Sequence, residues 1–149
     1  MDKSVILLVE DDPDDVFFLQ EAFKKADMAG ALRVARDGEE AVAYLLGQGA
    51  FADRRQHPPP ALVLLDLKLP RRSGLEVLEW RRGQPGMASI PVVVLTSSVS
   101  ETDVRRAYEL GANAYLVKPI ESGAQDEMVG TIRRFWLGLN RLPDPASPP

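Results

Sequence analysis

Residues 5–13 read VILLVEDDP: a short apolar run leads directly into three carboxylates and a proline. A continuous apolar run of this length, ended by polar residues, is typical of a strand buried on both faces. Pro13 suits the first turn of a helix, where its missing N–H costs nothing. The segment therefore predicts a buried strand over residues 5–9 and a helix that begins beside Glu10, Asp11 and Asp12.

The same strand-then-helix pattern recurs along the chain. Further strands are predicted at 32–35, 61–65, 91–95 and 114–117, and further helices at 41–46, 75–82, 101–110 and 125–138. Short apolar strands that alternate with amphipathic helices imply the α/β class, as a doubly wound parallel sheet with five strands.

Two segments fall outside this pattern. Residues 47–60 form a long polar loop with glycines and three consecutive prolines, interpreted either as a tolerated surface insertion or as a functional loop. Residues 141–149 are rich in proline and serine and are predicted to be a disordered tail. One domain, residues 1–140, accounts for the rest.

Composition narrows the function classes. The chain has 149 residues and a net charge of −4, which argues against nucleic acid as the main partner. It has no cysteine and one histidine, His57 in the proline-rich loop, so thiolate chemistry, a histidine triad and a zinc site are disfavoured. The sequence shows neither a signal peptide nor a stretch long enough to cross a membrane, so we expect a cytoplasmic protein.

Reactive side chains follow four of the predicted strands. Glu10 and Asp11 follow the first, Asp66 the third, Thr96 the fourth, and Lys118 with Pro119 the fifth. Because the carboxyl ends of parallel strands share one edge of the sheet, where ligands bind in such folds, these groups are expected to converge.

The carboxylates suit Mg²⁺, which prefers oxygen ligands and takes one or two carboxylates plus a phosphate. We expect Glu10, Asp11 and Asp66 to be ligands, and the backbone carbonyl of Lys68 is a further candidate. The other acidic residues near this point, Asp12, Asp14 and Asp15, are interpreted as favouring the positive end of the first helix.

Asp66 is the expected nucleophile, because a carboxylate can attack phosphorus to give an aspartyl-phosphate. A cation, a lysine and a hydroxyl would stabilise the charge on the transferred group, which fits Lys118 and Thr96. A cis bond before Pro119 would fix the direction of Lys118, although trans is the usual state.

Four motifs together resemble the receiver domain of two-component response regulators, from about Val5 to about Phe135. They are Ile6-Leu7-Leu8-Val9-Glu10-Asp11-Asp12-Pro13, Leu64-Leu65-Asp66-Leu67-Lys68-Leu69-Pro70, Val94-Leu95-Thr96-Ser97 and Gly111-Ala112-Asn113-Ala114-Tyr115-Leu116-Val117-Lys118-Pro119. The loop before Asp66 and the aromatic segment Phe135-Trp136-Leu137 resemble, more narrowly, the stand-alone regulators that partner phytochromes.

This resemblance implies a CheY-like, flavodoxin-like fold with strand order 2-1-3-4-5. It implies that Asp66 accepts a phosphoryl group from a phosphohistidine on a sensor histidine kinase, and the narrower resemblance implies a kinase of the phytochrome type. Mg²⁺ would be held by Asp11, Asp66 and the Lys68 carbonyl, and through water by Glu10, where the family often has aspartate.

The resemblance also implies roles in signalling. Lys118 would pair with the phosphoryl oxygens, and Ser97 would be small enough to leave them accessible. Thr96 would move toward the phosphoryl group and Tyr115 would then change rotamer, so that phosphorylation shifts a conformational population. Such a protein is a signalling phosphoacceptor, at most losing its phosphoryl group slowly, and not an enzyme.

The last predicted helix carries a wide apolar stripe of Met128, Ile132, Phe135 and Leu139, with Val129 and Trp136 beside it. The candidate dimer-face residues are Met128, Ile132, Phe135 and Trp136. Two interpretations remain: a homodimer face with aromatic hot spots, formed by this helix and the last strand, or a thick core stripe.

Rival functions differ in what they require. A Mg²⁺-dependent aspartyl phosphatase normally has a second acid just after the nucleophile, where this chain has Leu67 and Lys68. A flavodoxin-like cofactor binder needs glycine and hydroxyl residues in the first loop, which here is acidic. Within the receiver class, a phosphate sink or a degenerate receiver that acts by binding alone stays open.

Overall fold

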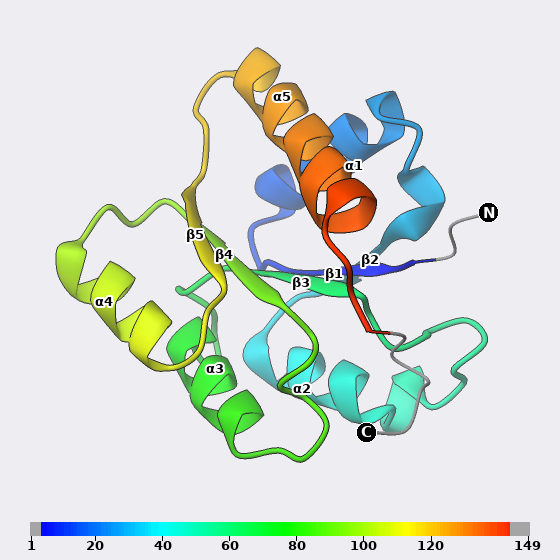
Figure 1. Cartoon of the computed structure of the whole chain (residues 1–149), viewed down its shortest axis with the longest axis vertical. Coiled ribbons are helices and arrows are strands. Elements are labelled where there is room, and N and C mark those ends of the chain that lie inside the picture. Colours follow the sequence, from blue (N-terminus) through cyan, green and yellow to red (C-terminus); the bar gives the residue numbers. More distant parts are fainter. Residues whose placement is uncertain (1–3, 144–149) are drawn as a thin grey trace.

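The fold is a five-stranded parallel sheet with helices on both faces (Figure 1), and the computed structural model describes residues 4–143. The strand order is β2-β1-β3-β4-β5, which confirms the predicted doubly wound α/β fold. The strands are β1 Ile6–Val9, β2 Leu32–Ala35, β3 Leu62–Leu65, β4 Val92–Thr96 and β5 Ala114–Val117.

The helices divide between the two faces of the sheet. They are α1 Pro13–Lys25, α2 Gly38–Leu46, α3 Gly74–Arg82, α4 Glu101–Glu109 and α5 Ser122–Ile132, with the short segments η1 Ala29–Ala31 and η2 Gly49–Phe51. Figure 1 shows α1 and α5 together on one face, and α2, α3 and α4 on the other.

Alternate strand residues build two separate cores. Leu7 and Val9 pack under α2, α3 and α4, whereas Ile6 and Leu8 pack under α1 and α5. Both faces of the sheet are therefore buried, which explains why the strands read as unbroken apolar runs.

Side-chain caps fix where four helices begin, α1 to α4. The Asp12 carboxylate accepts hydrogen bonds from the amides of Asp14 and Asp15 at 2.9 and 3.4 Å, which confirms its expected role at the start of α1. Ser73 and Glu76 form a reciprocal capping box at the start of α3.

The last helix differs from its prediction. It begins earlier, at Ser122, and after Ile132 it continues as the wider π-helical segment η3, Arg133–Leu139. Ile132 is buried in the core of the same chain, so its assignment to a dimer face is wrong. Met128 and Trp136 also pack partly against that core, whereas Phe135 keeps 47% of its surface exposed.

The loop over residues 47–60 is ordered by its own contacts. The Arg54 guanidinium donates hydrogen bonds to the carbonyls of Tyr44, Leu45 and His57 at 2.8–2.9 Å. The rings of Tyr44, Phe51 and His57 pack against one another at centroid distances of 5.1–5.8 Å. The predicted long loop is thus an ordered segment that contains the short helix η2, and its role as an insertion or a functional loop stays a prediction.

Three further predictions concern the peptide bond before Pro119, membrane-spanning helices and the C-terminal tail. Within residues 4–143 every peptide bond is trans, including the one before Pro119. Over the same residues, no helix combines the length and apolar character needed to span a bilayer. The predicted tail lies outside the described residues from position 144 onward.

Candidate functional site

The carboxyl ends of four strands meet at one edge of the sheet and bring the predicted site residues together. β1 and β3 are in register, with Val9 paired to Leu65, so Glu10 and Asp66 follow them side by side. The Asp66 amide donates to the Val9 carbonyl at 3.1 Å, and the Lys118 amide donates to the Thr96 carbonyl at 2.8 Å. These two bonds continue the parallel hydrogen-bond ladders by one residue beyond the strands. They therefore place the Asp66 and Lys118 side chains at the edge of the sheet.

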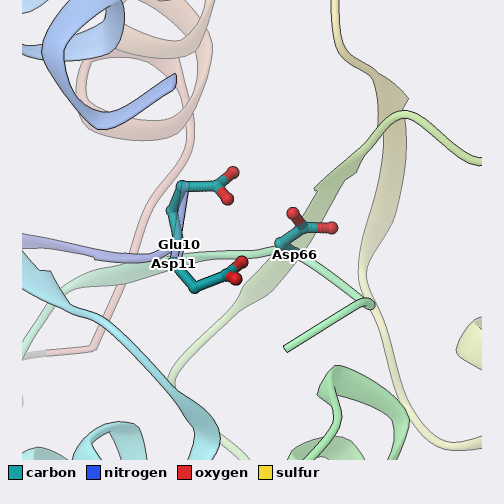
Figure 2. A group of neighbouring side chains, drawn as sticks. All are labelled: Glu10, Asp11 and Asp66. Atoms are coloured by element: carbon teal, nitrogen blue, oxygen red, sulfur yellow. The ribbon is translucent and has the colours of Figure 1, made fainter. Parts of the chain in front are cut away.

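Three carboxylates form a compact cluster at this edge. Glu10, Asp11 and Asp66 each offer an oxygen, and these oxygens lie within 4.8 Å of one another (Figure 2). Glu10 and Asp66 are 1% and 6% exposed, whereas Asp11 faces solvent. Such crowded negative charge is unfavourable without a counter-ion, and an all-oxygen donor set with one open side fits a hard divalent cation.

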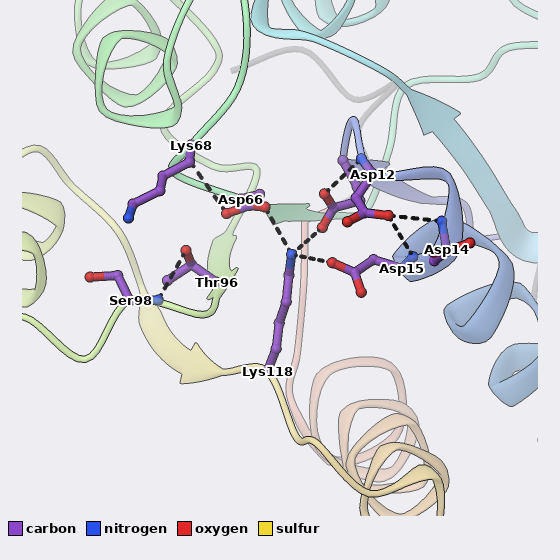
Figure 3. A network of polar contacts seen from close by, with 9 residues as sticks. Asp12, Asp14, Asp15, Asp66, Lys68, Thr96, Ser98 and Lys118 are labelled. Atoms are coloured by element: carbon purple, nitrogen blue, oxygen red, sulfur yellow. Dashed lines mark hydrogen bonds and ion pairs between the residues drawn. The ribbon is translucent and has the colours of Figure 1, made fainter.

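Lys118 supplies positive charge beside this cluster. Its Nζ lies 2.5 Å from Glu10 Oε1, 2.8 Å from Asp15 Oδ2 and 2.9 Å from Asp66 Oδ2 (Figure 3). An ammonium group has three N–H donors, so three carboxylates satisfy it completely. The side chain is only 15% exposed, which makes this a largely buried network.

The network shifts the ionisation of its members. Burial raises the pKa of Glu10 to about 7, partly offset by its hydrogen bond from Lys118 and reinforced by the charge on Asp66. Burial by itself would lower the pKa of Lys118, but hydrogen bonds to Asp15, Glu10 and Asp66 outweigh it and raise the pKa. Lys118 is therefore a stable cation at neutral pH.

The loop after Asp66 turns back sharply and needs a glycine to do so. A Cβ atom at Gly74 would lie 2.2 Å from the Asp66 carbonyl oxygen, and the Gly74 amide donates to the Leu67 carbonyl at 2.9 Å. The Lys68 amide approaches Asp66 Oδ1 at 3.4 Å. The loop thus wraps around Asp66, and the Lys68 carbonyl as a metal ligand stays a prediction.

Thr96 and Tyr115 both connect to the loop between β4 and α4. Thr96 is fully buried at the end of β4, and its Oγ1 lies 3.5 Å from the Ser98 amide. The Tyr115 hydroxyl donates to the Ser98 carbonyl at 3.0 Å, while Ser98 Oγ donates to Asp103 at 2.6 Å. Ser98 therefore joins the two predicted switch residues, while Ser97 beside it is exposed.

Two residues of this site were not predicted from the sequence. Asp15 was interpreted only as a helix-end charge, yet its carboxylate contacts Lys118, 103 positions away. Ser98 was not singled out, although both Tyr115 and the start of α4 depend on it. The Asp15–Lys118 and Tyr115–Ser98 contacts have no sequence signal, because each joins elements that only the folded sheet brings together.

Comparison with known proteins agrees with this geometry. The family model described as the response regulator receiver domain matches residues 6–132. Response regulator Rcp1 from Synechocystis is 43% identical over 139 residues, covering 93% of this chain and 92% of Rcp1. A probable methanogenesis regulatory protein, FilR2 from Methanothrix harundinacea, is 40% identical, covering 97% of this chain and 91% of FilR2.

Solved structures are similar to this chain over nearly its whole length. The Mn²⁺-bound form of Rcp1 superposes with a TM-score of 0.83 at 42% identity, covering 95% of this chain and 99% of Rcp1. The phosphorylated cyanobacterial phytochrome response regulator RcpA gives a TM-score of 0.87 at 37% identity, covering 96% of this chain and all of RcpA. One of these relatives thus carries a divalent cation and the other a phosphoryl group.

Proposed function

The chain belongs to the response regulator receiver family, and we propose that it is a stand-alone regulator in which Asp66 is the phosphoacceptor. The observation that carries this proposal is the position of the Asp66 carboxylate. It is almost fully buried, lies 2.9 Å from the Lys118 ammonium, and shares a cluster with Glu10 and Asp11.

The proposed reaction is a phosphoryl transfer from a phosphohistidine. An Asp66 carboxylate oxygen forms a bond to phosphorus as the bond from phosphorus to the imidazole nitrogen breaks, and that nitrogen keeps the electron pair. Asp66 starts as an anion, so it needs no general base. Lys118 stabilises the negative charge of the transferred group, which is where most of the catalysis of such transfers arises.

Glu10, Asp11 and Asp66 would hold Mg²⁺, with the Lys68 carbonyl as a fourth protein ligand. The oxygen donor set supports a divalent cation, and Mg²⁺ is the natural choice for a phosphoryl reaction. When bound, the ion would neutralise charge on the phosphoryl oxygens. Glu10 would contact the ion through water, and its longer side chain keeps the negative charge of the aspartate that the family often has at this position.

The proposed signal travels through Thr96 and Tyr115. A phosphoryl group on Asp66 adds a strong acceptor near the end of β4, and Thr96 would move to donate to it. That movement would disturb the loop at Ser98, to which the Tyr115 hydroxyl is bonded. Tyr115 would then change rotamer, so the altered surface lies over α4, β5 and α5.

A sensor histidine kinase of the phytochrome type is the proposed phosphodonor. Support comes from RcpA, a phytochrome response regulator that this chain matches over almost its whole length. The equally extensive likeness to FilR2 favours a different stimulus, so the kinase class needs a direct test. We further propose that the protein is cytoplasmic and is a signalling phosphoacceptor rather than an enzyme. Residues 1–140 would form the receiver unit.

The test is phosphotransfer from purified, autophosphorylated histidine kinases, one set with phytochrome sensor domains and one without. Transfer to the wild type, but not to Asp66→Asn, is expected, and the phytochrome set should transfer fastest. Equal rates from both sets would reject the phytochrome pairing while keeping Asp66 as the phosphoacceptor. Binding without transfer from any kinase would instead indicate a degenerate receiver.

A further inference from the structure

Lys118 has one partner that stands apart from the other two. Glu10 and Asp66 belong to the carboxylate cluster that suits a metal ion, and within residues 4–143 that cluster comprises only these two and Asp11. Asp15 contacts Lys118 at 2.8 Å but is not a member of the cluster. A cation bound there would therefore compete with Lys118 for two of its three partners and leave the third.

Asp15 is held by a rigid element. It lies in the first turn of α1, where its amide is capped by Asp12 at 3.4 Å, and the next residue, Val16, is buried in the core. Its side chain is 33% exposed, so the contact with Lys118 is partly shielded from water. The ion pair thus connects Lys118, which follows β5, to the start of α1, although the two residues are 103 positions apart in the chain.

We infer that Asp15 is a positioning residue, which holds the Lys118 ammonium beside Asp66 when the carboxylate cluster carries its cation. This inference rests on the proposed function, because the position matters only if Lys118 must meet phosphoryl oxygens. An ammonium on a flexible four-carbon stem needs such a tether, since a small misplacement of a stabilising charge slows a reaction strongly. Asp15 is neither the proposed phosphoacceptor nor a member of the carboxylate cluster.

Asp14 offers a matched control for the charge itself. It is the neighbouring residue in the same turn, it is exposed, and its replacement by alanine removes the same charge from the same helix end. Any general effect on cation attraction or on the helix dipole is shared by Asp14→Ala and Asp15→Ala. Only Asp15→Ala removes the contact with Lys118.

The first test observes Lys118 directly, by NMR of ¹⁵N-labelled lysine ammonium groups in saturating Mg²⁺. The Lys118 signal, assigned by its loss in Lys118→Arg, should stay resolved in wild type and Asp14→Ala, because an ordered ammonium is protected from exchange with water. It should broaden beyond detection in Asp15→Ala and return in Asp15→Glu. A signal that persists unchanged in Asp15→Ala would overturn the inference, whether or not the protein is phosphorylated.

The second test measures phosphorylation by acetyl phosphate at saturating Mg²⁺. Asp15→Ala should react ~10-fold more slowly than Asp14→Ala, with the same Mg²⁺ affinity, and should add nothing further in a Lys118→Gln background. Equal or faster reaction of Asp15→Ala would reject the positioning role. Failure of the wild type to react would count against the proposed function, and the NMR result would still decide the role of Asp15.

Discussion

The Lys118 ammonium, which follows β5, lies 2.9 Å from Asp66 Oδ2, which follows β3, so this contact crosses the end of the intervening strand β4. Without a metal ion, Lys118 is also the cation that offsets the buried charge of Glu10. The same residue therefore serves the stability of the resting protein and the proposed chemistry.

Lys118→Gln should lower the free energy of unfolding by about 2–4 kcal/mol in EDTA, because it leaves Glu10 and Asp66 as buried carboxylates with no partner charge. Urea denaturation measures this loss, which should shrink in saturating Mg²⁺. Lys68→Gln, at an exposed lysine of the same site, should change stability by less than ~0.5 kcal/mol. An equal, small change in both variants would show that the network does not stabilise the fold.

Mg²⁺ should stabilise the wild type, since a ligand that binds only the folded state adds about 2.7 kcal/mol at a concentration 100 times its Kd. Asp11→Asn should lose most of this gain, because it removes an exposed member of the cluster without disturbing Lys118. Thermal unfolding across a Mg²⁺ titration gives both values. Asp14→Asn should respond to Mg²⁺ like the wild type, and an unchanged response in Asp11→Asn would argue against the cluster as the metal site.

The Arg54 side chain anchors the folded loop over residues 47–60 to the end of α2. Arg54→Ala removes hydrogen bonds to three carbonyls and should lower stability by about 2–3 kcal/mol. Hydrogen exchange, followed by mass spectrometry, should become faster throughout residues 47–60. Arg55→Ala, at the exposed neighbouring position, should leave exchange unchanged, so a matching increase in that variant would contradict the role of Arg54.

Homodimerisation stays a proposal, and the surface left for it is smaller than the sequence suggested. Of the four predicted residues, Phe135 is the most exposed, and Leu139 one turn later is 80% exposed. Phe135→Glu should shift a dimer to monomer in sedimentation velocity. Tyr108→Glu, at a similarly exposed aromatic on α4, is the matched control. A wild type that stays monomeric at every concentration would exclude the dimer.

The strands and the site edge were predictable because burial on both sheet faces leaves a clear apolar signal. The first strand was expected at residues 5–9 and forms at Ile6–Val9, and the fourth ends at Thr96 rather than one residue earlier. Parallel order then forces Glu10, Asp66 and Lys118 to one edge, so their convergence followed from the topology alone.

The features that could not be predicted depend on distant contacts. Arg54 anchors its loop to carbonyls at the end of α2, which no local pattern reveals. The change to a π-helical segment after Ile132 has no sequence signal that we can identify. The pairing of Asp15 with Lys118 requires the start of α1 and the residue after β5 to meet at the same edge of the sheet.

The measurement that tests the central claim most directly is the intact mass of the protein after incubation with Mg²⁺ and acetyl phosphate. A single phosphoryl adduct is expected in wild type and Asp14→Asn, and none in Asp66→Asn or after addition of EDTA. An adduct that persists in Asp66→Asn, or that forms equally well without Mg²⁺, would contradict Asp66 as the metal-dependent phosphoacceptor.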